Sequence, residues 1–128
     1  MPTVLLVDDD VDLVQINKLL LEKEGFTVLV AYDGEECKAK ALEARPDVIV
    51  LDVMMKTDTE GIHVARELRA REETKTIPIV MLTAVKERIP WRFEADKEWL
   101  PVDDFLAKPA TPKLLIDAIR QVLNRKEG

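Results

Sequence analysis

The chain has almost no cysteine and no long apolar run. Its single cysteine, Cys37, excludes a disulfide within the chain, which suits a reducing cytosol. We expect Cys37 to be a small, partly buried helix residue rather than a redox sensor. No segment approaches the roughly 18 consecutive apolar residues that a transmembrane helix requires. No basic region precedes an apolar stretch at the N-terminus, as it would in a signal peptide. These absences favour a cytoplasmic protein with no membrane contact.

Basic residues are scarce relative to acidic ones. The 128 residues include 19 Lys and Arg against 25 Asp and Glu, which gives a formal net charge of −6. Nucleic-acid backbones bind clusters of Lys and Arg, so we expect no direct contact with nucleic acid. A hydrophobic fraction of 47% beside 34% charged residues is typical of a globular chain. This length suits one domain, which we predict to span residues 1–128.

Short apolar runs alternate with longer segments of helical period. Runs such as 4–7 and 48–51 are apolar on both faces, which is typical of a parallel sheet covered by helices on both sides. We predict strands over 4–7, 26–31, 48–51, 79–82 and 104–107. We predict helices over 11–24, 35–44, 62–72 and 112–125. The alternation predicts an α/β fold with a doubly wound parallel sheet and right-handed crossovers.

Local signals mark several helix ends and inner faces. Thr111 is the expected N-cap of the last helix with Pro112 at its first position, and Gly25 follows the first helix as a C′ glycine should. Asp10 fits the N-cap of the first helix. The inner face of the last helix is predicted to hold Leu114, Leu115, Ala118, Ile119 and Val122, and that of the third Ile62, Val64, Ala65 and Leu68.

Polar side chains stand where the predicted strands end. The first strand is followed by Asp8 and Asp9, the third by Asp52, the fourth by Thr83 and the fifth by Lys108. Ligands of open α/β sheets bind outside the carboxyl ends of the strands. We therefore expect three carboxylates, a hydroxyl and an ammonium group to converge in one site.

This set of groups favours phosphoryl chemistry with Mg²⁺. Clustered carboxylates repel one another unless a cation joins them, and Mg²⁺ prefers oxygen ligands. The absence of His and Cys from these strand ends argues against zinc or copper. A carboxylate such as Asp52 can attack phosphorus to form an aspartyl phosphate. Lys108 and Mg²⁺ would neutralise the developing charge, and Thr83 would donate a hydrogen bond to a phosphoryl oxygen.

Five short motifs, in order along the chain, carry a resemblance to a known family. Together they resemble the receiver domain of two-component response regulators, the CheY-like superfamily. The motifs are Val7-Asp8-Asp9, Asp52-Val53-Met54-Met55, Leu82-Thr83-Ala84, Asp103 to Ala107, and Lys108-Pro109.

The resemblance implies a fold, a reaction and a donor. The fold is flavodoxin-like, a (βα)5 arrangement with strand order 2-1-3-4-5. Asp52 looks like the acceptor of a phosphoryl group from a sensor histidine kinase or a histidine phosphotransfer protein. Such a domain is a switch rather than an enzyme, because it catalyses only its own phosphorylation and dephosphorylation.

The resemblance also assigns roles around Asp52. Asp9 looks like a direct Mg²⁺ ligand and Asp8 like a partner acting through water, while the backbone carbonyl of Met54 would complete the protein ligands. Thr83 and Phe105 look like the switch pair. Lys108 looks like the partner of the phosphoryl group.

The sequence departs from the family pattern at two places. Lys56 replaces the usual proline after Asp52-Val-Met-Met, and Gly61 comes about one residue late, so we expect altered kinetics or partner choice rather than loss of the acceptor. The segment 84–103 carries Pro90 where a regular fourth helix would lie. We expect an irregular fourth-helix region. In the family that the chain resembles, the face of helix 4, strand 5 and helix 5 is commonly the output surface. The aromatic side chains of the Trp91 to Trp99 region either bind the unknown partner at this face or cover the core.

Two rival functions remain open at this point. A Mg²⁺-dependent phosphatase with an Asp nucleophile typically needs a second Asp two residues further on, where Met54 stands. A docking module that is never phosphorylated would not need the complete set of polar strand-end residues, although Lys56 leaves some room for it.

The residues that would position water for hydrolysis predict a long-lived phosphoprotein. Met54 and Val85, two residues past Asp52 and Thr83, are apolar and cannot orient a water molecule in line with phosphorus. Phosphoryl-Asp52 should therefore decay slowly. Loss of radiolabel from the purified phosphoprotein measures its lifetime, and a lifetime of only seconds would contradict the prediction.

Overall fold

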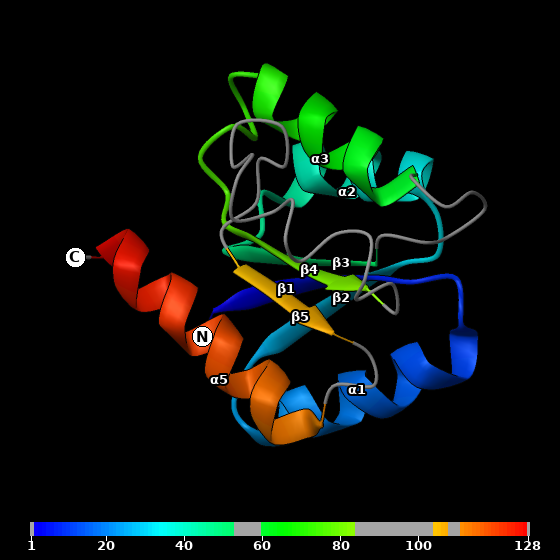
Figure 1. Ribbon diagram of the computed structural model, residues 1–128, viewed down its shortest axis with the longest axis vertical. Helices are drawn as coiled ribbons and strands as arrows, with labels where there is room; N and C mark the ends of the chain where they lie inside the picture. Colours follow the sequence, from blue (N-terminus) through cyan, green and yellow to red (C-terminus); the bar gives the residue numbers. More distant parts are fainter. Residues whose placement is uncertain (1, 53–59, 84–103, 108–110, 128) are drawn as a thin grey trace.

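The computed structural model describes residues 2–52, 60–83, 104–107 and 111–127. Strands and helices alternate along the described chain (Figure 1). The strands are β1 (Thr3–Val7), β2 (Thr27–Ala31), β3 (Val48–Asp52), β4 (Ile79–Thr83) and β5 (Asp104–Ala107). The helices are α1 (Val11–Lys23), α2 (Gly34–Ala44), α3 (Glu60–Ala70) and α5 (Pro112–Glu127).

The strands form one parallel sheet in the order β2-β1-β3-β4-β5. The predicted α/β class and the flavodoxin-like strand order are therefore confirmed. The chain runs outward from β1 to β2, and then returns to β3 and continues to β4 and β5 in the opposite direction. The order thus reverses between β1 and β3, and open α/β sheets bind ligands at the carboxyl ends of the strands at such a point.

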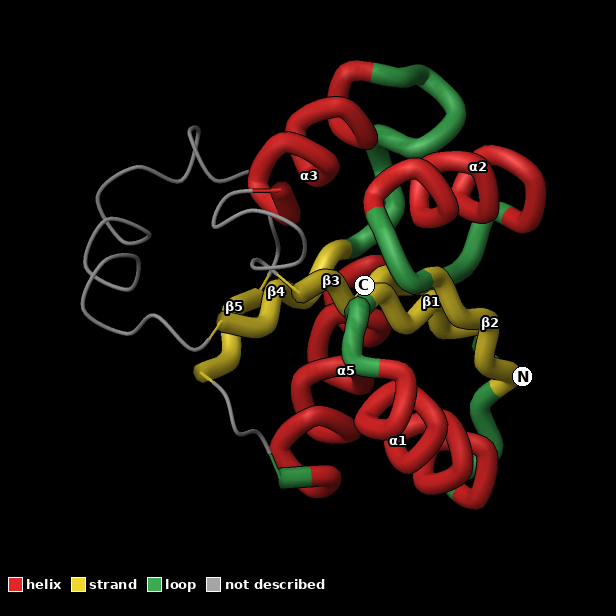
Figure 2. Tube along the Cα trace, turned by 90° about the vertical axis from the view of Figure 1, so that its right-hand side faces the viewer, coloured by secondary structure: helices red, strands yellow, loops and turns green. Residues whose placement is uncertain are grey.

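Helices cover both faces of the sheet. Figure 2 shows α2 and α3 on one face and α1 and α5 on the other. Side chains alternate along each strand, so Leu5 and Ile49 pack toward α2 and α3, whereas Leu6 and Val50 pack toward α1 and α5. Because helices cover both faces, each strand is apolar apart from one polar residue at its end, which is why the strands appear in the sequence as continuous apolar runs.

Short-range hydrogen bonds fix the helix ends that the sequence indicated. The Asp10 side chain accepts a hydrogen bond from the amide of Leu13 at 3.1 Å, and Thr111 Oγ1 accepts one from the amide of Leu114 at 3.2 Å. Gly25 has φ +97°, a backbone conformation that favours glycine. These predicted caps are confirmed.

The first and last helices are joined at one end of the molecule. Arg120 of α5 forms an ion pair with Glu24, the residue after α1, at 3.1 Å. Its guanidinium carbon also lies 5.8 Å from the centre of the Phe26 ring, within the range of a cation–π interaction. These contacts hold α5 beside α1 on the shared face of the sheet.

Two predictions about side-chain position were wrong. Leu114, expected on the inner face of α5, is 52% exposed, because the buried stripe consists of residues at helical spacing from Leu115, whereas Leu114 lies about 100° away from it. Cys37 is fully rather than partly buried, and burial raises the pKa of its thiol to about 12. The expected inner face of α3 is confirmed, since all of its predicted members are buried: Ile62, Val64, Ala65 and Leu68.

Some predictions fall outside the described residues. They are the irregular fourth-helix region over 84–103, with its Trp91 to Trp99 surface, and the effect of Lys56 on the loop after β3.

A matched pair of substitutions tests the assignment of the core. Ile49 of β3 is 0% exposed and Ile16 of α1 is 55% exposed. Ile49→Ala should lower the free energy of unfolding by about 2–5 kcal/mol, because it removes buried apolar volume and leaves a cavity. Ile16→Ala should change it by less than about 1 kcal/mol. Urea unfolding measures both values, and equal losses would contradict the assignment.

Candidate functional site

The register of the sheet brings Asp8 and Asp52 together. Val7 of β1 lies opposite Leu51 of β3, so the next residue on each strand is an aspartate at the same edge. The amide of Asp8 continues the ladder by donating a hydrogen bond to the carbonyl of Ala31 at 3.2 Å. Asp8 is 6% and Asp52 3% exposed. Two adjacent parallel strands therefore hold two largely buried acids side by side at the reversal of strand order.

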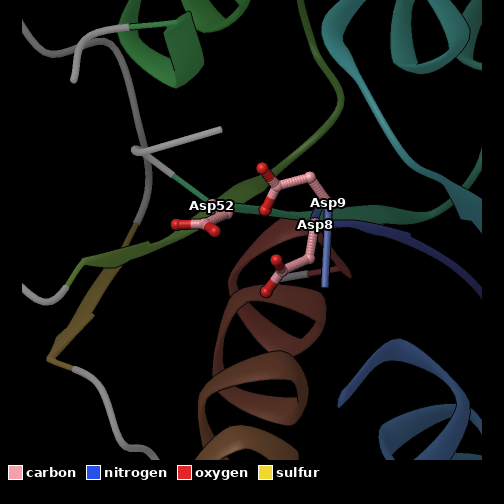
Figure 3. A group of neighbouring side chains, drawn as sticks. All are labelled: Asp8, Asp9 and Asp52. Carbon is pink, nitrogen blue, oxygen red and sulfur yellow. The ribbon is translucent and has the colours of Figure 1, made fainter. Parts of the chain in front are cut away.

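The turn from β1 into α1 adds the third acid. Asp9 is exposed at this turn. Asp8 Oδ1 accepts a hydrogen bond from the amide of Asp10 at 3.0 Å, which holds the turn closed. Asp10 is the N-cap of α1, whereas Asp9 lies with Asp8 and Asp52 at the site (Figure 3).

Asp8, Asp9 and Asp52 form a carboxylate cluster that suits a cation. Each offers a carboxylate oxygen, and these oxygens all lie within 4.8 Å of one another. Opposite ligands of one octahedral Mg²⁺ ion are about 4.2 Å apart, so the three groups lie within reach of a single ion, directly or through bound water. Three like charges at this separation repel, and a divalent cation would remove that repulsion. The all-oxygen donor set fits Mg²⁺ rather than zinc or copper.

The other predicted site residues are described only in part. Thr83 is the last residue of β4 and is paired with Ala107 of β5, and Phe105 lies on β5 opposite Met81. Their backbones therefore belong to the edge where the cluster lies, but their side chains are outside what the structure describes. Met54 and Lys108 also lie outside the described residues. Their roles stay predictions.

Sequence reasoning missed one contact at the same edge of the sheet. Glu60 Oε2, on the first residue of α3, accepts a hydrogen bond from the backbone amide of Gly34 at the start of α2, at 3.0 Å. α2 begins three residues after β2 ends, and α3 begins eight residues after β3 ends. No spacing rule connects two residues this far apart in the chain, and no local signal pointed to the pair.

Comparison with known families identifies the class. The family model of the response regulator receiver domain matches residues 4–120, and the chain belongs to this family. It is a receiver domain of the response regulators of two-component phosphorelay systems, as its motifs indicated. This class consists of signalling domains rather than conventional enzymes.

Curated relatives agree with the family match over nearly the whole chain. The chain is 38% identical to the alkaline phosphatase synthesis transcriptional regulatory protein PhoP of Bacillus subtilis, over 97% of this chain and 49% of that protein. It is 41% identical to the transcriptional regulatory protein CpxR of Klebsiella pneumoniae, over 98% of this chain and 50% of that protein. The chain thus spans about half the length of the curated relatives it matches.

Solved structures share the fold. A Vibrio cholerae chemotaxis protein, CheY4, superposes with a TM-score of 0.83 at 34% identity, covering 95% of this chain and 98% of that chain. The receiver domain of the Francisella response regulator 1452 gives a TM-score of 0.84 at 30% identity, with 98% of each chain covered.

Among the helices described in this chain, none is long and apolar enough to cross a membrane.

The charge cluster makes a prediction about stability. Without Mg²⁺, Asp9→Asn should raise the free energy of unfolding by on the order of 1 kcal/mol, because it removes one of three neighbouring negative charges. With Mg²⁺, the wild type should gain stability by binding the ion in its native state, and the variant should gain less. Urea unfolding at low salt with and without MgCl₂ measures both effects.

Asp10→Asn is the matched control for this test. It removes a neighbouring charge outside the cluster and keeps a side-chain oxygen for the cap. It should retain the full Mg²⁺ gain, and equal responses of the two variants would contradict a site built on Asp9.

Proposed function

We propose that Asp52 is the phosphoryl acceptor of this receiver domain, and that Asp8 and Asp9 hold the Mg²⁺ ion that the reaction needs. The observation that carries the proposal is the cluster of three carboxylates at the reversal of strand order, in a chain that belongs to the receiver family. Asp52 is the member that ends a central strand, and it is almost fully buried. A rigid strand end positions a nucleophile well.

The proposed step transfers a phosphoryl group between two proteins. One carboxylate oxygen of Asp52 forms the new P–O bond, while the P–N bond to a histidine of the donor breaks and its electron pair returns to the imidazole nitrogen. The donor is a sensor histidine kinase or a histidine phosphotransfer protein. When bound, Mg²⁺ would supply neutralisation of the charge on the phosphoryl oxygens. Lys108 and the Thr83 hydroxyl are the further groups assigned to these oxygens.

The sheet keeps the reacting carboxylate in place during this step. Asp52 is paired with Leu82 of β4 on one side and follows a residue paired with β1 on the other. Its backbone is therefore held by strands on both sides. Asp8 is held at the turn by a hydrogen bond from its amide to Ala31 and by a hydrogen bond that its side chain accepts from Asp10.

The wider role follows from the family and is part of the proposal. Residues 1–128 form one receiver domain that acts in the cytoplasm, and its phosphorylation state controls a partner through the face of helix 4, strand 5 and helix 5. The relatives are transcriptional regulators, and one is named a DNA-binding response regulator, MtrA of Mycolicibacterium smegmatis. In this acidic chain we assign no direct contact with nucleic acid to the receiver domain itself.

Intact mass after incubation with acetyl phosphate tests the acceptor. The wild type should gain one phosphoryl group in the presence of Mg²⁺ and none after the metal is removed with EDTA. Asp52→Asn should gain none under either condition, because the amide is not a nucleophile toward phosphorus.

Asp10→Asn serves as the control and should be phosphorylated like the wild type. A gain in Asp52→Asn equal to that of the wild type would place the acceptor elsewhere. No gain in any of the three proteins would favour a docking module that is not phosphorylated.

A further inference from the structure

A hydrogen bond between two side chains joins α1 to the end of β2, close to the carboxylate cluster. Gln15 Nε2, on the second turn of α1, donates to the Tyr32 hydroxyl at 3.1 Å. Tyr32 is the first residue after β2, so it lies at the carboxyl edge of the sheet. Its neighbour Ala31 accepts a hydrogen bond from the amide of Asp8 at 3.2 Å. The end of β2 therefore contacts both the start of the β1–α1 turn and the helix that follows this turn.

These two contacts lie on either side of the turn that carries Asp9. The backbone hydrogen bond fixes the point at which the turn leaves β1, and the side-chain hydrogen bond fixes the helix into which the turn runs. Asp10 connects the two parts, because its side chain caps α1 by accepting from the amide of Leu13 at 3.1 Å. Asp9 thus belongs to a ring of covalent and hydrogen bonds that closes on β2.

The β2 side of this ring is held by further hydrogen bonds. The amide of Tyr32 donates to Glu36 Oε1 at 3.3 Å, and the amide of Glu36 donates to Asp33 Oδ1 at 2.9 Å. These bonds tie Tyr32 to the first turn of α2, and its side chain is half-buried. The Tyr32 hydroxyl is therefore a well-placed acceptor, against which the first half of α1 is oriented.

Asp9 is the member of the carboxylate cluster whose position depends on this turn. Asp52 belongs to β3, and the amide of Asp8 continues the ladder of β1 with β2, so both are placed by the sheet. Asp9 is exposed and comes one residue later, between the end of β1 and the start of α1. Its approach to the other two acids therefore depends on how the turn and α1 lie against β2.

We propose that Gln15 and Tyr32 are positioning residues for the Mg²⁺ site, and that their hydrogen bond keeps the Asp9 carboxylate within reach of the other two acids. Neither residue belongs to the carboxylate cluster, and both act through the backbone that carries Asp9. The inference rests on the proposed function, because it explains how one of the proposed Mg²⁺-binding residues is oriented. By linkage, bound Mg²⁺ should in turn strengthen this hydrogen bond.

The test removes each hydrogen-bonding group without changing the charge of the protein. Tyr32→Phe deletes only the hydroxyl, and Gln15→Met keeps a long unbranched side chain that cannot donate. Isothermal titration calorimetry with MgCl₂ measures the Mg²⁺ affinity of the wild type, both single variants and the double variant. Each single variant should bind Mg²⁺ about twofold to fivefold more weakly, as expected for the loss of one neutral hydrogen bond. The double variant should bind no more weakly than the weaker single variant, because both changes remove the same bond.

Thr74→Val is the matched control for a general loss of stability. Thr74 is fully buried, and its hydroxyl donates to the carbonyl of Leu68 at 2.6 Å. It lies between α3 and β4, and therefore at the opposite edge of the sheet from the carboxylate cluster. This variant also loses one hydroxyl hydrogen bond and should unfold at lower urea concentration than the wild type. It should nevertheless bind Mg²⁺ with wild-type affinity.

Amide hydrogen exchange, followed by NMR without Mg²⁺, gives a readout that does not depend on the metal. The amide of Asp10 donates to Asp8 Oδ1 at 3.0 Å within the turn. This amide should exchange faster in Tyr32→Phe and in Gln15→Met, because the turn opens more often when α1 is no longer held against β2. In Thr74→Val it should exchange at the wild-type rate.

Three results would overturn the inference. They are wild-type Mg²⁺ affinity in either single variant, losses of affinity that add in the double variant, or an equal loss of affinity in Thr74→Val. A wild-type chain that binds no Mg²⁺, or that is not phosphorylated in its presence, would instead reject the proposed function. The two failures are therefore distinguishable.

Discussion

The parallel pairing of β1 with β3 is the constraint on which the site depends. It sets Val7 against Leu51, and everything at the carboxyl edge follows from that register. A shift of one residue would move Asp8 away from Asp52 and would turn the apolar side chains of the strand to the wrong faces. The same hydrophobic burial that selects the register therefore also sets the spacing between the two buried acids. The site needs no separate scaffold.

The edge of the sheet holds three carboxylates that repel one another, while the packed faces of the sheet stabilise the fold. The three carboxylates each offer an oxygen within 4.8 Å of the others, at the rim of a sheet whose two faces are packed with apolar side chains. Their mutual repulsion is tolerated because the two packed faces supply the stability, and because a cation or a covalently bound phosphoryl group changes the local charge balance. A domain built in this way is sensitive to the occupancy of its site, which is the property that a switch requires.

The fold could be predicted almost completely from the sequence, and the site only in part. Continuous apolar runs, the C′ glycine Gly25 and the Thr111 cap are local signals, and each appears where expected. Asp8, Asp9 and Asp52 could be predicted as a cluster because topology alone brings strand ends together. Leu114 was misplaced because a leucine beside a buried leucine carries no sign of which one faces the core.

The Glu60–Gly34 hydrogen bond shows why the remainder could not be predicted. It depends on the distance between two helices that β3 separates in the chain. Such a distance is set by tertiary packing. The lack of a side chain at Gly34 permits the close approach of Val64 and Glu60 of α3. A contact of this kind can be recognised only when the positions of both helices are known.

The division of the interior by the sheet has a further consequence for how this domain can change over time. One apolar compartment holds Leu5 and Ile49 under α2 and α3, and the other holds Leu6 and Val50 under α1 and α5. Side chains in one compartment meet none in the other, so a change of volume on one side must be compensated by neighbours on that same side. The two halves can therefore be remodelled independently, by evolution or by an engineer, as long as the strand backbone that separates them keeps its register.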